Sequence, residues 1–158
     1  MQSGAEKTRA QKARDLVQER KFGFLATISE RMSGYPFGSV MPYAADTQGR
    51  PLVLISMLAV HTQNLLASPK ASLLVYEPAV EAEPLSAARM NLLGEVRQVP
   101  ESEAIEARSI YLERHPEAAP YIDFGDFALY RMDIVDIYYI GGFGEMGWVT
   151  HNEYAAAS

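Results

Sequence analysis

Short apolar runs separated by turn residues dominate the chain after residue 21. They are rich in branched and aromatic side chains, which favour strands. Between two of these runs, the segment DTQGR with Gly49 predicts a hairpin turn. Pro42 predicts an edge position or a bulge, and Gly94 predicts a bend or bulge. The pattern predicts six strands, over residues 22–29, 38–46, 51–57, 71–78, 88–99 and 127–142, the last of which is a single strand or a bent pair.

Helical spacing is clearest near the N-terminus. Apolar residues recur there every three or four positions, at Ala10, Ala13, Leu16 and Val17, with charged residues between them. A later segment opens with Pro100 and acidic residues, as helices often do. The sequence predicts helices over residues 5–20, 61–68 and 100–115, a loop over 79–87 and an irregular tail over 143–158.

Strands and helices do not alternate along the chain, which disfavours a parallel sheet with crossover helices. Short and closely linked strands favour an antiparallel barrel, in which closure removes exposed sheet edges. We therefore predict a mainly β fold with flanking helices. The 158 residues predict a single domain over 1–158, with the N-terminal helix inside 1–20 and the C-terminal tail at 143–158.

Composition narrows the function classes. The formal net charge of −6 argues against a general nucleic-acid binder, which needs a basic face. There is no cysteine, so disulfides and thiolate metal sites are excluded. The charged N-terminal stretch resembles no signal peptide, and no apolar run approaches the roughly 18 residues of a membrane span. We expect no membrane partner and a cytoplasmic location.

Common catalytic motifs are missing from the sequence. It contains no dinucleotide-binding fingerprint, no Walker loop, no zinc-protease motif and no nucleophile elbow. The three histidines, His61, His115 and His151, lie far apart in sequence and have no metal-ligand spacing. The segment DFGDF, with Asp123 and Asp126, is typical of a turn. We therefore predict no metal site and name no catalytic residue.

One polar turn stands out between two apolar runs. His61 and Thr62 follow a strand and open a short helix. The first amides of a helix have no partner within it, and together with small polar side chains they suit a phosphate group. The alternative is that Thr62 simply caps the helix.

Several stretches taken together resemble a known family. GFLATIS, GRPLVLISMLAVHTQNL, SPKASLL, ARMNLLGEVRQV and GGFGEMGWV are similar to the pyridoxamine-5′-phosphate-oxidase-like FMN-binding split-barrel proteins. Within that family, the sequence most resembles the branch of HugZ-type haem oxygenases, over residues 8–150. The resemblance implies a six-stranded antiparallel split β-barrel. It also implies a homodimer with FMN sites at the subunit interface.

The resemblance further implies which residues hold the flavin. Ser39 would face the ribityl-phosphate, and Ile55 and Ser56 would close one side. His61 and Thr62 would bind the phosphate, with affinity rising from about pH 8 towards 6 as His61 gains a proton. The complete implied set is Ser39, Val40, Met41, Tyr43, Ile55, Ser56, His61, Thr62, Asn64, Arg89 and Tyr139.

The sequence departs from the oxidases where phosphates bind. Their phosphate turn carries an Arg-Lys pair, replaced here by His61 and Thr62, and their Tyr-x-x-x-Arg pattern becomes Tyr111 to His115. Three functions follow from the resemblance. The first is FMN-dependent redox chemistry on a small organic or tetrapyrrole substrate. The second is haem binding and breakdown with His151 as iron ligand, and the third is a cofactor-free dimeric binding module. His151 as a solvated tail residue and Arg89 as a surface residue are the plainer alternatives.

Overall fold

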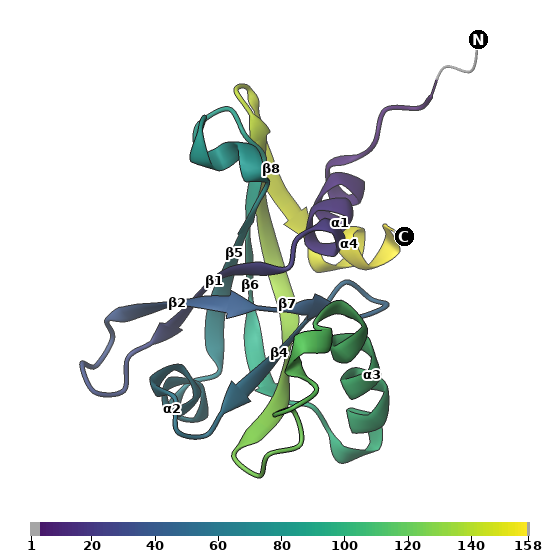
Figure 1. Ribbon diagram of the computed structural model, residues 1–158. Coiled ribbons are helices and arrows are strands. Elements are labelled where there is room, and N and C mark those ends of the chain that lie inside the picture. Colours follow the sequence, from purple (N-terminus) through teal and green to yellow (C-terminus); the bar gives the residue numbers. More distant parts are fainter. Residues whose placement is uncertain (1–3, 158) are drawn as a thin grey trace.

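One antiparallel sheet of eight strands forms the body of the structure, a computed structural model that describes residues 4–157 (Figure 1). The strands run in the order β2, β1, β5, β6, β7, β4 and β3, and β8 also pairs with β7. The mainly β fold with flanking helices is therefore confirmed, with eight strands in place of six. The strands are β1 (Phe22–Ile28), β2 (Pro36–Pro42), β3 (Ala44–Ala45), β4 (Pro51–Ser56), β5 (Lys70–Tyr76), β6 (Arg89–Gln98), β7 (Phe127–Gly142) and β8 (Glu145–Thr150).

Four α-helices flank this sheet. The first and last lie side by side next to β8, the third covers β3 and β4, and the second lies beside β1 (Figure 1). Within residues 4–157, no helix is both long enough and apolar enough to cross a membrane. The helices are α1 (Arg9–Glu19), α2 (Val60–Ala67), α3 (Ala104–Arg114) and α4 (His151–Ala156), and the 3-10 turns are η1 (Pro78–Glu81), η2 (Glu101–Glu103) and η3 (Pro116–Ala118).

Helix α1 forms where the sequence predicts it, and a capping box fixes its start. The Thr8 hydroxyl accepts a hydrogen bond from the N–H of Gln11, and the Gln11 side chain accepts one from the N–H of Thr8. The predicted apolar positions of the helix are buried. The Tyr43 hydroxyl donates to the carbonyl of Val17 at 2.7 Å, which ties the helix to the end of β2.

The longest strand, β7, pairs with three others. Its residues Phe127–Arg131 pair with β4, its C-terminal half pairs with β8, and β6 runs along most of its length. The register between β6 and β7 shifts between Leu93 and Gly94, so the predicted bulge at Gly94 is confirmed. A Cβ atom on Gly94 would collide with the backbone oxygen of Asp133, which shows how closely the two strands approach there.

Most of residues 143–157 form a strand and a helix, so the prediction of an irregular tail was wrong there, and residue 158 of the predicted tail lies outside the described residues. Gly142 and Gly144 adopt positive φ angles and turn the chain back on itself. The returning segment pairs with β7 as β8. The Thr150 hydroxyl then accepts a hydrogen bond from the N–H of Glu153 and caps α4. The tail therefore extends the sheet and packs a helix against α1.

The predicted strand 38–46 is two strands in the structure. β2 pairs with β1, whereas β3 pairs with β4 across the predicted hairpin turn at Gly49. Pro42 ends β2, which lies at one edge of the sheet, so its predicted edge position is confirmed. The chain leaves one ladder and enters another at Tyr43, and this change of partner is not visible in the apolar pattern.

We expect Gly94→Ala to lower the free energy of unfolding by about 1–3 kcal/mol, because the new methyl group would overpack the β6–β7 bulge. Gly38→Ala is the matched control, since a Cβ atom at Gly38 would meet nothing within 4 Å. Urea denaturation of both variants measures the difference. Equal stabilities would contradict the close approach of the strands at Gly94.

Candidate functional site

The turn between β4 and α2 is already internally hydrogen-bonded. The Ser56 hydroxyl donates to the carboxylate of Asp126 at 2.9 Å and accepts from the N–H of Leu58 at 3.1 Å. The N–H of Met57 donates to the backbone oxygen of Asp126, and that of Ala59 donates to the backbone oxygen of Ser56. The three amides that follow Ser56 are therefore engaged within the chain.

His61 and Thr62 lie in the first turn of α2, but Nε2 of His61 and the hydroxyl of Thr62 are shielded from solvent. Thr62 is fully buried, and neither its hydroxyl nor Nε2 of His61 has a hydrogen-bond partner among residues 4–157. The N-cap residue of α2 is Ala59, and no side chain makes a capping hydrogen bond there. Thr62 lies inside the helix and does not cap it. Burial lowers the pKa of His61 below its usual value, which keeps the ring neutral near pH 7. Any gain from a charged His61 therefore needs a lower pH than a histidine of ordinary pKa would need.

Asn64 holds α2 against the sheet. Its amide nitrogen donates to the hydroxyl of Thr27 at 3.0 Å, and its amide oxygen accepts from the N–H of Glu30 at 3.0 Å. The side chain is buried and directed toward β1 and the turn after it. Its hydrogen bonds therefore support the position of the α2 turn.

Four of the implied flavin residues belong to the main hydrophobic core. These residues are Met41, Tyr43, Ile55 and Tyr139. Burial raises the pKa of Tyr139, whose ring lies on the inner face of β7. Ser39 is partly buried, whereas Val40, its neighbour on β2, is 64% exposed on the opposite face. The structure thus divides the implied set between the interior and the surface.

The α2 turn is a poor match for a flavin phosphate next to Ser56. It has no arginine or lysine, the Ser56 hydroxyl and the three amides that follow it are engaged, and the Asp126 carboxylate accepts from Ser56. A second anion placed at Ser56 would meet this negative charge. The Asp126 carboxylate therefore disfavours an FMN phosphate next to Ser56.

On the other surface of the sheet, α3 packs against Leu52, Leu54 and Leu129, and the remainder is open and apolar. We call it the outer face. Across six strands its paired residues form two rows, which cross-strand pairing places on one side of the sheet. The exposed apolar members include Val40, Phe24, Met146 and Trp148. The first row is Val40, Phe24, Leu74, Asn91, Tyr138 and Trp148. The second row is Pro42, Phe22, Tyr76, Arg89, Ile140 and Met146, in which Phe22 and Tyr76 meet through an edge-on contact of their rings.

Aromatic rings concentrate on the outer face. Phe24 and Tyr76 stack with ring centroids 5.8 Å apart, and Phe22 meets both rings edge-on. The ring centroids of Tyr138 and Trp148 lie 5.0 Å apart. Tyr138, not the implied Tyr139, is therefore the tyrosine of β7 that this surface presents, because successive strand residues point to opposite faces.

The three histidines differ sharply in accessibility. His115 is buried, with Nε2 2.7 Å from the backbone oxygen of Tyr43 and Nδ1 3.1 Å from the Glu117 carboxylate. Nε2 of His61 is shielded, as described above. His151 is exposed at the first position of α4, directly after β8. His151 is therefore the most exposed of the three histidines, whereas His61 is half-buried and His115 is buried.

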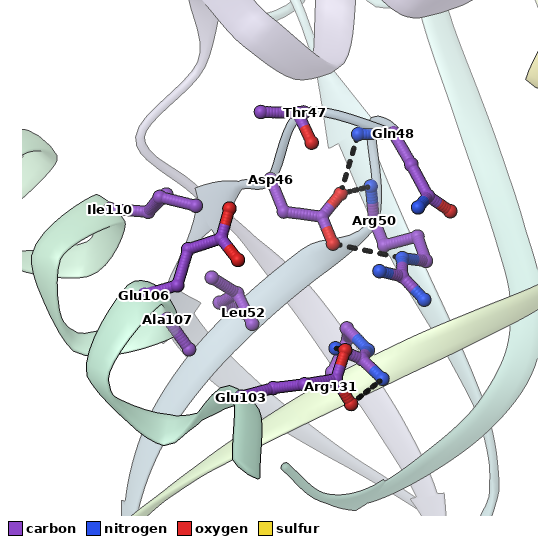
Figure 2. Close-up of a pocket in the computed structure, with 10 residues that line it drawn as sticks. All are labelled: Asp46, Thr47, Gln48, Arg50, Leu52, Glu103, Glu106, Ala107, Ile110 and Arg131. Carbon is purple, nitrogen blue, oxygen red and sulfur yellow. Dashed lines mark hydrogen bonds and ion pairs between the residues drawn. The ribbon is translucent and has the colours of Figure 1, made fainter. Parts of the chain in front are cut away.

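A small charged hollow lies between the β3–β4 turn and α3, away from the implied residues (Figure 2). Its volume is about 120 Å³, well below the roughly 300–1,000 Å³ of typical ligand pockets. Arg50 pairs with Asp46, and Arg131 pairs with Glu103. Asp46 also accepts bonds from two backbone N–H groups of its own turn. These ion pairs bridge η2 to β7 and order the β3–β4 turn.

Comparison with known proteins agrees with the fold and with the predicted haem-oxygenase branch. The chain is 40% identical over 139 residues to the chloroplastic haem oxygenase HOZ of Arabidopsis thaliana, covering 85% of this chain and 42% of that protein. It matches the structure of a haem-binding protein from Mycobacterium smegmatis with a TM-score of 0.89 and 31% identity, covering 97% of this chain and 62% of the other. The chain thus spans only part of these two relatives.

The split-barrel fold is confirmed by a more distant structure. A protein of the pyridoxinephosphate oxidase family from Clostridium acetobutylicum matches with a TM-score of 0.70 at 15% identity, over 92% of this chain and 96% of the other. A family model, the CREG β-barrel, matches residues 4–156. This match spans nearly the whole sequence, and the chain therefore belongs to the CREG β-barrel family.

Proposed function

We propose that this chain binds haem on the outer face of its sheet, with His151 as the iron ligand, and that it takes part in haem breakdown. The observation that carries the proposal is the histidine arrangement. His151 alone is exposed, and it directly follows β8, whose Trp148 and Met146 lie on the outer face. The relatives named for haem binding and haem oxygenation support haem as the molecule that binds.

The outer face has the chemistry that haem requires. Haem is a flat apolar ring with two carboxylates, so it needs exposed apolar and aromatic surface together with nearby cations. Phe24, Tyr138 and Trp148 supply the surface, and Arg89 supplies a positive charge. Bound haem would supply the redox chemistry, and these residues would bind and orient it.

We expect His151→Ala to abolish the shift of the haem Soret band that the wild-type protein produces, because an exposed imidazole ligand is lost. His61→Gln is the matched control, since Nε2 of His61 is shielded from solvent. Absorbance titration with haem provides the measurement. A Soret shift that survives in His151→Ala would remove His151 from the site, and its absence in the wild type would refute haem binding.

A homodimer formed through the outer face is the second part of the proposal. An open apolar sheet surface is unusual for a monomer and is typical of an interface. Val40 and Trp148 are more than half exposed at opposite ends of one row, so the apolar surface spans the sheet. A second copy of the chain would cover it with the haem held between the two copies, since the family resemblance implies cofactor sites at the subunit interface.

We expect Val40→Glu to weaken the dimer by about 3–5 kcal/mol, because it would bury an unpaired charge between the subunits. Ile105→Glu is the control, since Ile105 is 87% exposed but lies on α3, away from the outer face. Analytical ultracentrifugation at micromolar concentration distinguishes the species. A wild-type monomer, or equal dissociation by both variants, would argue against this interface.

FMN-dependent redox chemistry, also implied by the resemblance, is disfavoured by Asp126 at the α2 turn. We expect the wild type to bind FMN no more tightly than phosphate-free riboflavin. Two unit charges a few ångströms apart near a protein surface repel by on the order of 1–4 kcal/mol. Asp126→Asn should therefore raise the preference for FMN about tenfold.

Asp123→Asn is the control for this titration, because Asp123 is exposed and pairs with Arg108. Quenching of flavin fluorescence reports both affinities. A wild-type protein that binds FMN much more tightly than riboflavin would support a phosphate site at the turn. If neither flavin nor haem binds, the cofactor-free dimeric binding module is the function left.

A further inference from the structure

Arg20 occupies a distinctive position at the edge of the outer face. It follows α1 as the C-cap residue, and its guanidinium lies 5.9 Å from the ring centroid of Phe22 and 6.0 Å from that of Tyr76. Both rings belong to the outer face. Both distances are within the reach of a cation–π interaction, so the charge of Arg20 lies beside the aromatic rings.

The charge of Arg20 is not neutralised by the described chain. No carboxylate of residues 4–157 lies within ion-pair distance of it, and its Nε–H is shielded from water without a hydrogen-bond partner. The partly buried Arg50 and Arg131, by contrast, both face carboxylates. A partly buried cation without a counter-ion is costly, and an anionic ligand would offset that cost.

A second arginine flanks the same aromatic group. Arg89 is paired with Tyr76 across β5 and β6, so their Cβ atoms are about 4.5–5.5 Å apart on one face. Nη1 of Arg89 donates only to backbone oxygens, those of Leu85 and Ala87. Tyr76 therefore lies between two arginines that no carboxylate of the described chain pairs, although the whole chain carries a net charge of −6.

We propose that Arg20 binds a carboxylate of a flat aromatic ligand that lies on Phe24 and Tyr76. The proposal rests on the proposed haem function and deepens it, because it assigns a residue to the ligand's acidic side chains. A porphyrin carries two such side chains on one edge. Arg20 and the Tyr76–Phe24 stack together match that combination of a charged edge and an apolar body.

Metal-free protoporphyrin IX and its dimethyl ester are the probes that test this assignment. Neither contains iron, so ligation by His151 plays no part in the measurement. We expect the wild type to bind the free acid at least about tenfold more tightly than the ester, because a charge-assisted hydrogen bond is lost on esterification. Arg20→Gln should bring this ratio close to one. Arg31→Gln, at an exposed arginine of the β1–β2 turn, should leave it unchanged.

Porphyrin absorbance gives the affinities, and thermal melting confirms that each variant is folded. If Arg20→Gln does not fold, Arg20→Lys replaces it, and a reduced ratio is expected because lysine lacks the planar fork of donors. A wild type that binds both porphyrins equally, or binds neither, would overturn the assignment. So would a ratio that Arg20→Gln leaves intact. Loss of the haem Soret shift in His151→Ala is independent of all these outcomes.

Discussion

The continuous pairing of β7 is the interaction on which the rest of the structure depends. A single strand of 16 residues is long enough to pair with β6 along one side and with β4 and then β8 along the other. The bulge at Gly94 lets β6 follow it through the bend. This pairing joins the β3–β4 hairpin to the main sheet and fixes where the C-terminal tail returns.

The same pairing creates the inner and outer faces of the sheet. The inner face closes on α1 and fills with apolar side chains, so Tyr43 and Tyr139 serve the core. On the outer face, Phe24 and Trp148 stay exposed within residues 4–157, so their rings remain available to a ligand or a second chain. Helices α1 and α4 lie side by side at one end of the sheet (Figure 1). The contrast between these faces supports haem on the outer surface better than FMN at the α2 turn.

Local signals in the sequence predict a large part of this fold. Gly94, Pro42 and the apolar face of α1 each act within a few residues, so their roles are confirmed. Strand β8 is different, because a six-residue segment forms only when β7 extends beside it. The break at Tyr43 likewise depends on which strand each half meets, which no local pattern reveals.

The candidate site is less predictable for the same reason. Asp126 lies 70 residues from Ser56, whose hydroxyl donates to it, so the sequence does not reveal a carboxylate beside the residue expected to close one side of the flavin site. A shift of one residue decides whether Tyr138 or Tyr139 reaches the outer face, since strand side chains alternate. Arg20 was missed because its contacts with Phe22 and Tyr76 need the register of two strands.

Helix α4 fixes the backbone position of His151. The hydroxyl of Tyr154 donates to the backbone oxygen of Gly49 at 2.5 Å, and Arg14 of α1 donates to the backbone oxygen of Tyr154. Folding therefore already restricts the backbone that carries His151. Ordering a backbone residue costs about 1–2 kcal/mol. A ligand that binds His151 would not need to order this backbone, because folding has already done so. The helix therefore preorganises His151 for binding.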